Sequence, residues 1–213
     1  MYTPRAFALD DLPELQQLIQ HTRLAQLVTF GEQGLQACHL PLLLNPDEGP
    51  NGMLYGHLAK ANPQWKDLQN GSEALVIFAG AEAYISPAFY PAKAEHGKVV
   101  PTWNYIAVHA YGKAEVFNDA ERLLAVVTAL TDRHEGGRAQ PWKVSDAPAD
   151  YIDGMLKAIV GFALPIERLI GKRKLSQNRS AADMAGVRAG LATSADVRDQ
   201  TLARFIPPQG APE

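Results

Sequence analysis

Cysteine is almost absent from this sequence of 213 residues, which contains Cys38 alone. A single thiol excludes an intrachain disulfide framework and a cysteine-rich zinc site, and it is typical of a reducing compartment. No stretch reaches the roughly 18 apolar residues that a membrane-spanning helix needs. No apolar segment of signal-peptide length precedes Asp10 and Asp11. We therefore expect a cytoplasmic protein with no membrane partner.

An excess of charge of one sign is also lacking. The chain has 20 Lys and Arg against 23 Asp and Glu, which gives a net charge of −3. Proteins that bind nucleic acid through its phosphates need a cationic surface, so any such surface here must be local. The strongest local candidate is the segment from Lys172 to Arg179, which carries four cations in eight residues.

Several well-known site motifs are missing. The chain has no G-x-G-x-x-G, Gly171-Lys172 lacks the other residues of a Walker loop, and His134-Glu135 lacks the second histidine of a zinc protease. Dinucleotide, P-loop and zincin functions therefore have no support. Cys38 and His39 are neighbours on a predicted strand and point to opposite faces, so they cannot act together as nucleophile and base.

Periodicity predicts strands first and helices later. Helical spacing or helix-start signals occur over residues 11–22, 64–69, 119–134, 148–160, 180–191 and 194–205. Strand patterns occur over 24–30 and 35–44, which form a hairpin, and over 53–60, 75–78, 83–86, 103–117 and 161–170. We expect a mainly β protein, an antiparallel barrel with flanking helices, in which residues 1–170 form the main domain and 171–213 a basic motif with a C-terminal helical extension.

Two segments combine polar residues with an element boundary. Lys60 and Asn62 lie where a predicted strand passes into a helix, an arrangement that either cradles a phosphate or simply caps the helix. Asn104 stands between Trp103 and Tyr105 directly after the proline-rich segment 87–101, which is typical of a covered site. These three residues suit either a flat heterocycle or a packed aromatic corner.

Further candidates allow more than one interpretation. Ser176, Gln177 and Asn178 lie inside the basic segment, which could bind a phosphate, a nucleic-acid backbone or only water. His39, His57 and His109 lie within predicted strands, where histidine either ligates a metal or haem or hydrogen-bonds a backbone carbonyl.

Taken together, these blocks resemble the PaiB family of FMN-binding negative transcriptional regulators. The resemblance extends over about residues 1–191 and rests on segments 38–41, 56–65, 84–87, 100–105 and 174–179. It implies the FMN-binding split barrel of the pyridoxamine-phosphate-oxidase type, working as a homodimer with the flavin at the subunit interface.

The resemblance also implies cofactor-binding positions. Lys60 and Asn62 match the place where split-barrel proteins hold the FMN phosphate, and Trp103 and Asn104 fall beside the flavin ring. The complete implied set is His39, His57, Lys60, Asn62, Thr102, Trp103, Asn104, Lys174, Ser176, Gln177, Asn178 and Arg179. No metal ligands are predicted, and catalytic residues are not assigned.

Three functions follow as hypotheses. The first is a PaiB-type repressor, for which the resemblance implies DNA as a partner although the net charge of −3 argues against direct binding. The second is an FMN-dependent oxidoreductase that uses NAD(P)H. The third, ranked last, is a haem-binding or haem-degrading split barrel that uses one of the histidines.

Overall fold

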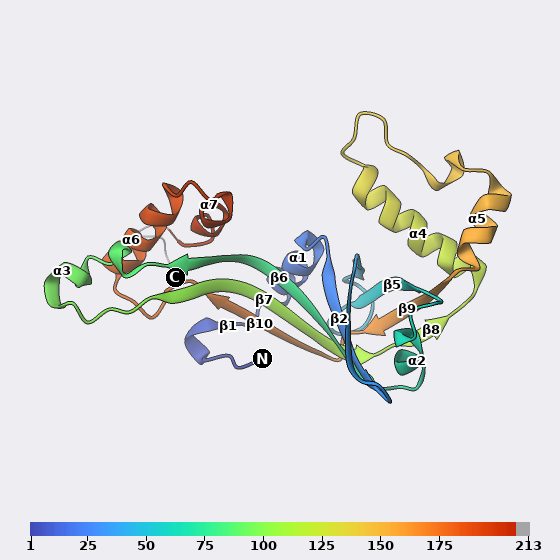
Figure 1. Ribbon diagram of the computed structural model, residues 1–213, viewed down its shortest axis with the longest axis horizontal. Coiled ribbons are helices and arrows are strands. Elements are labelled where there is room, and N and C mark those ends of the chain that lie inside the picture. The colour runs from blue at the N-terminus through green and yellow to red at the C-terminus, as the bar shows by residue number, and fades with distance from the viewer. Residues whose placement is uncertain (208–213) are drawn as a thin grey trace. The chain divides into compact units, whose positions relative to one another are not determined.

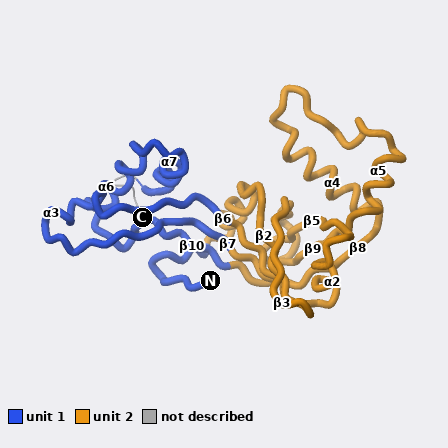
Figure 2. The backbone as a smooth tube through the Cα atoms, viewed as in Figure 1, with its two compact units in different colours: residues 1–10, 79–108, 170–213 blue, residues 11–78, 109–169 orange. Residues whose placement is uncertain are grey.

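The chain divides into two compact units, each assembled from segments far apart in the sequence (Figure 2). The computed structural model describes residues 1–207. Unit 1 comprises residues 1–10, 79–108 and 170–213, and unit 2 comprises residues 11–78 and 109–169. The predicted boundary at residue 170 stays a prediction, and the end of the predicted C-terminal extension, 208–213, lies outside the described residues.

Figure 1 shows the elements, most of which belong to one unit. Unit 2 contains α1 (Leu12–His21), β2 (Ala25–Gly31), β3 (Gly34–Leu40), β4 (Leu43–Asn45), β5 (Met53–Ala59), α2 (Gln64–Gln69), β8 (Glu115–Phe117), α4 (Ala120–Glu135), η3 (Val144–Asp146), α5 (Ala149–Leu156) and β9 (Ile159–Pro165). Unit 1 contains η1 (Arg5–Phe7), β1 (Ala8–Leu9), η2 (Pro87–Phe89), α3 (Ala92–His96), α6 (Ala181–Ala192) and α7 (Val197–Ala203). Three strands contribute residues to both units: β6 (Glu73–Ile85), β7 (Thr102–Lys113) and β10 (Arg168–Lys174).

The strands within residues 1–207 form two sheets. One has the order β1-β10-β7-β6-β2-β3 and the other β4-β5-β9-β8. The hairpin β2–β3 pairs antiparallel from Ala25 opposite Leu40 to Gly31 opposite Gly34, and Gly34 takes a φ of 84° at the end of the turn. A residue with a side chain is strained at such a φ, so glycine closes this turn at least cost.

Helix α4 covers the four-stranded sheet. Asp119 caps the helix, since its carboxylate accepts a hydrogen bond of 2.8 Å from the backbone N–H of Arg122. Leu123, Val126 and Leu130 then recur on one face and pack with Phe117, Leu156 and Ala163 in a buried cluster. This cluster fixes α4 and α5 against β8 and β9.

The predicted amphipathic and capped segments are confirmed. The helices expected over 11–22, 64–69, 119–134, 180–191 and 194–205 correspond to α1, α2, α4, α6 and α7, and the strand at 53–60 is also present. The hairpin is present as β2 and β3, but the strand expected over 35–44 is wrong, because it ends at Leu40 and residues 43–45 form β4 in the other sheet. Among residues 1–207, no helix is both long enough and apolar enough to cross a membrane.

Several predicted boundaries are wrong. Segments 75–78 and 83–86 belong to one strand, β6, because Gly80 interrupts the sequence pattern but lets the strand approach the carbonyl of Ile106, which would lie 3.1 Å from an added Cβ. The strand expected over 103–117 breaks at Ala114 into β7 and β8. The helix expected over 148–160 ends at Leu156, because the chain from Ile159 pairs with β5.

The basic segment is the most consequential correction. The single strand expected over 161–170 is two strands, β9 and β10, and Lys172, Arg173 and Lys174 lie within β10. The backbone N–H of Ile166 and of Glu167, in the connection between them, donate to Gly52 and Tyr111. The cations therefore extend a sheet and do not form a loop.

Candidate functional site

The sequence-predicted site residues fall into two groups, one in each unit. His39, His57, Lys60 and Asn62 belong to unit 2. Unit 1 contains Thr102, Trp103, Asn104, Lys174, Ser176, Gln177, Asn178 and Arg179. The second group is assembled by the start of β7, the end of β10 and the turn that follows β10.

Lys174 joins the two strands in unit 1. Its Nζ donates to Thr102 Oγ1 at 2.5 Å and to the carbonyl of Trp103 at 2.6 Å. Burial lowers the pKa of Lys174, and the nearby charges of Lys172 and Arg179 lower it further. Neither Lys174 nor its two cationic neighbours pairs with a carboxylate of the residues described. The site therefore carries positive charge that an anion would neutralise.

A buried polar pair joins the same two segments, with Asn104 next to Trp103 and Ser176 two residues after Lys174. Asn104, which is 0% exposed, donates through Nδ2 to Ser176 Oγ at 2.9 Å. The other amide atom of Asn104, Oδ1, is buried and has no hydrogen-bond partner among residues 1–207. Burying an unpaired acceptor costs free energy. The hydrogen bond from Asn104 to Ser176 joins the start of β7 to the turn after β10.

The turn after β10 is held by its own side chains. Ser176 has a φ of 67°, in the left-handed region that residues other than glycine rarely adopt. Gln177 Oε1 accepts from the backbone N–H of Leu175 at 2.6 Å, and Gln177 Nε2 donates to the carbonyl of Arg173. Arg179 lies over the ring of Tyr90 at 5.1 Å, while Asn178 is exposed.

Much of the basic segment is turned inward. Lys172 is only 7% exposed, donates to the carbonyl of Tyr2 at 3.0 Å and lies 5.0 Å from the ring of Tyr105. Burial also lowers the pKa of Arg173. Lys172 and Lys174 therefore make contacts within unit 1, and the alternative in which the basic segment binds only water is wrong for these two residues.

Two aromatic side chains, Tyr84 and Trp103, lie at the start of β7. The rings of Tyr84 and Trp103 meet edge to face with centroids 6.1 Å apart, and Trp103 Nε1 donates to Glu82 at 2.5 Å. Trp103 remains 49% exposed and Tyr84 50%. Glu82 is not among the site residues predicted from the sequence, although it lies two residues before Tyr84 and therefore on the same face of β6.

In unit 2, the passage from β5 to α2 is held by local hydrogen bonds. Asn62 Oδ1 accepts from the backbone N–H of Gln64 at 3.0 Å, and Trp65 Nε1 donates to the carbonyl of Lys60 at 3.1 Å. The Lys60 side chain is exposed and makes no hydrogen bond or ion pair with a described residue. Asn62 therefore forms a side-chain turn directly before α2, whose N-cap is Pro63, and Lys60 is left available for an anion.

The strand residues of unit 2 differ in environment. Burial raises the pKa of Cys38, and a hydrogen bond with Asn62 opposes that shift. His39, the next residue on β3, is exposed. Burial lowers the pKa of His57 and of His109, so both rings are more readily neutral than a solvent-exposed histidine. Among residues 1–207, no group of His, Cys, Asp and Glu side chains is arranged to hold a metal ion.

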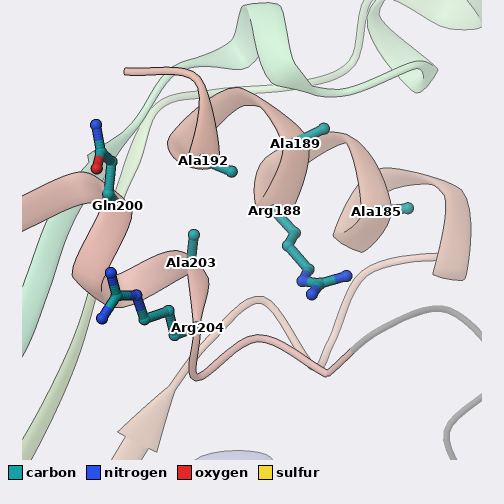
Figure 3. A pocket seen from close by; sticks show the side chains of 7 residues that line it. All are labelled: Ala185, Arg188, Ala189, Ala192, Gln200, Ala203 and Arg204. Atoms are coloured by element: carbon teal, nitrogen blue, oxygen red, sulfur yellow. The ribbon is translucent and has the colours of Figure 1, made fainter. Parts of the chain in front are cut away.

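A separate hollow lies between α6 and α7 (Figure 3). It measures about 580 Å³ and is lined by alanines, by Gln200 and by Arg188 and Arg204. Figure 3 shows the two arginine side chains extending in different directions, so their charges do not converge on one point. None of the predicted site residues lines it.

The residues of unit 1 fit the chemistry of FMN, which combines an anionic phosphate with a flat polar ring. The cations around Lys174 suit the phosphate, because none of Lys172, Lys174 and Arg179 is neutralised by a described carboxylate. The exposed Tyr84 and Trp103 offer aromatic contact, and Thr102 supplies a hydroxyl.

A family model and similar proteins identify the family to which the chain belongs. The model of a family described as "Putative FMN-binding domain" matches residues 1–168. The chain is 34% identical over 187 residues to the Bacillus subtilis protein named protease synthase and sporulation protein PAI 2, covering 88% of this chain and 87% of that protein. It is also 37% identical to an uncharacterised protein of Aspergillus fumigatus, over 90% of each chain.

Solved structures agree on the fold. The FAD and haem binding protein from Mycobacterium smegmatis matches with a TM-score of 0.58 and 18% identity, over 86% of this chain and 78% of that one. The flavocytochrome Anf3 from Azotobacter vinelandii matches with a TM-score of 0.59 and 16% identity, over 81% and 72%. These matches confirm the predicted class, a split barrel with flanking helices.

Proposed function

Because the chain belongs to the FMN-binding family that includes the PaiB-type proteins, we propose that it is an FMN-binding regulator that lowers the expression of target genes and works as a homodimer. FMN is the cofactor of this family. The regulatory role is supported by the extent of the similarity to the PAI 2 protein, which covers 88% of this chain.

The observation that carries the proposal is the uncompensated positive charge around Lys174. Lys174 is held by Thr102 and Trp103, and Lys172 and Arg179 are close enough to lower its pKa. An anionic phosphate placed there would gain charge-assisted hydrogen bonds. Bound FMN would supply redox chemistry, while the residues of this chain hold the phosphate and contact the ring.

The same geometry bears on how regulation would operate. Lys172 is buried, and in this proposal Lys174 holds the FMN phosphate, so neither cation is free to bind a DNA backbone as well. With a net charge of −3, the chain has no general attraction to phosphate either. We propose that repression depends on the FMN-bound dimer and that Lys172 to Lys174 do not contact DNA directly.

An FMN titration of the purified protein tests the cofactor site. We expect a saturable change in flavin fluorescence, and Lys174→Met should weaken binding by about tenfold or more, since it removes one charged hydrogen-bond donor. Lys93→Met is the matched control, because Lys93 is an exposed lysine of unit 1 on α3. Equal affinities for both variants and the unchanged protein would contradict the assignment of Lys174.

Transcript profiling tests the regulatory role. In a strain that lacks the protein, target transcripts should rise, and they should fall again with the unchanged protein but not with Lys174→Met. Light scattering with and without FMN would measure the dimer. If no transcript responds and the protein oxidises NADH or NADPH faster than free FMN does, the oxidoreductase alternative replaces the regulator.

A further inference from the structure

A cavity inside unit 2 is not explained by FMN binding. It measures about 290 Å³ and lies among β5, α4, α5 and the chain segment between the two helices. The side chains that matter for its chemistry are His57, Thr131, Trp142, Tyr151, Ile152 and Met155. A volume of this size suits a molecule of one or two rings.

The lining is apolar and aromatic. Among residues 1–207, no Asp, Glu, Lys or Arg side chain lines the cavity. Large apolar side chains nevertheless remain exposed around it: Trp142 is 46% exposed, Tyr151 60% and Met155 47%. The backbone N–H of Trp142 donates to Glu135 at 3.1 Å, so this tryptophan is attached to the end of α4. Clusters of exposed apolar side chains on one surface are typical of binding sites.

His57 supplies one polar group. Its Nδ1 is buried without a hydrogen-bond partner among the described residues. An unpaired buried N–H is rarer in proteins than an unpaired buried acceptor, so the neutral ring is best assigned with its proton on Nε2. Since His57 lines the cavity, the Nε2–H is the donor that the ring can offer to a ligand.

Thr131 supplies the second polar group. Its hydroxyl donates to the carbonyl of Val127 at 2.8 Å, one turn earlier on α4. The hydroxyl proton is thereby occupied, and the oxygen keeps lone pairs that can accept a hydrogen bond. The cavity therefore combines one donor and one acceptor within an uncharged aromatic lining.

We propose that this cavity binds an uncharged aromatic molecule of one or two rings that carries an amide or a similar donor–acceptor pair. The ligand's carbonyl would accept from His57 Nε2–H, its N–H would donate to Thr131 Oγ1, and its ring would contact Trp142 and Tyr151. This site goes beyond the proposed function and shares only His57 with the candidate cofactor-binding residues.

A fluorine NMR titration of the FMN-loaded protein tests this proposal. The probe is 4-fluorobenzamide, and 4-fluorobenzoate is the charged comparator. We expect saturable line broadening with the amide and a response at least tenfold weaker with the carboxylate, because the cavity has no cation to compensate a negative charge. Equal responses to the two probes, or no saturable response to the amide, would overturn the proposal.

Two variants locate the binding. Ile152→Trp fills the cavity and should abolish the benzamide response. Thr131→Val keeps the volume and should weaken binding by about threefold to tenfold, since it removes one hydrogen bond. Thr128→Val is the matched control, because Thr128 lies one turn away on α4 and does not line this cavity. A response that survives Ile152→Trp, or that Thr128→Val reduces as much as Thr131→Val, would refute the site.

The FMN titration separates this site from the cofactor site. FMN affinity should be unchanged in Thr131→Val and Ile152→Trp, and excess FMN should not displace the benzamide. Displacement by FMN would show that the cavity belongs to the cofactor site and would overturn the inference while leaving the proposed function intact.

Discussion

Asn104 and Ser176 form the most deeply buried polar pair of the candidate site, with exposed fractions of 0% and 3%. Ser176→Ala would leave the Asn104 amide without its partner, and we expect the free energy of unfolding to fall by about 1–3 kcal/mol. Urea unfolding measures this loss. The double variant Asn104→Ala with Ser176→Ala should lose less than the sum of the two single variants, and strict additivity would show that the pair is not coupled.

Lys60 is an exposed cation between β5 and α2, and the resemblance assigns it to the FMN phosphate, as an alternative to the Lys174 site of the proposed function. If that contact forms, Lys60→Ala should weaken FMN binding by roughly 1.5–3 kcal/mol, the usual range for a charge-assisted hydrogen bond. Fluorescence titration measures the affinity. Lys66→Ala serves as the control, since Lys66 is a nearby exposed lysine on α2. Unchanged affinity for Lys60→Ala would remove this residue from the site.

At the scale of elements, a glycine determines how closely α6 approaches η2. A Cβ added at Gly186 would lie 2.1 Å from the carbonyl oxygen of Phe89. A backbone atom cannot move away as a side chain can, so Gly186→Ala should destabilise the protein by about 1–3 kcal/mol.

Gly154 in α5 provides the matched control. An added Cβ there meets nothing within 4 Å, so Gly154→Ala should stabilise the protein by about 0.5–1 kcal/mol through helix propensity alone. Thermal unfolding of both variants compares them. If both variants changed the stability in the same direction, the close approach of Gly186 to Phe89 would not determine how α6 packs.

At the scale of the whole molecule, two half-buried histidines should make stability depend on pH. Burial lowers the pKa of His57 and of His109 below the ordinary value near 6.5. Between the ordinary and the lowered pKa, the unfolded chain therefore binds more protons than the folded chain. The free energy of unfolding is therefore not reduced by these two histidines above about pH 6.5, and it falls as the pH decreases from 6.5 toward the lowered pKa values.

Urea unfolding at pH 7.5, 6.5 and 5.5 tests this dependence. The double variant His57→Gln with His109→Gln should lose less of its unfolding free energy over this range than the unchanged protein. Equal slopes in the double variant and the unchanged protein would assign the pH dependence to other groups.

Local patterns were sufficient for much of this chain. The spacing of Leu123, Val126 and Leu130 predicted α4, and the helix starts at Asp11 and Ser180 were correct because capping depends on residues three positions apart. The alternation along β7 likewise predicted that Asn104 and Trp103 face opposite sides, and the structure confirms one as buried and the other as exposed.

Position relative to distant strands could not be predicted in this way. β1 has only two residues, and its pairing with β10 places Ala8 opposite Lys172, far along the sequence. That pairing, together with the contacts of Lys172 to Tyr2 and Tyr105, buries Lys172 within a hydrophilic segment. Composition alone predicts that Lys172 is exposed to solvent, because a local sequence pattern does not show which distant strand lies beside a charged residue.

The sequence by itself determined a single-cysteine chain with a net charge of −3, its barrel-and-helix class and its family resemblance, since these depend on composition, periodicity and short motifs. Only the tertiary structure decided that Lys172 and Arg179 lie near Lys174, although the net charge of the chain is small, and that His57 lines an uncharged cavity. The reason is physical: burial and charge proximity arise from contacts between residues distant in the chain.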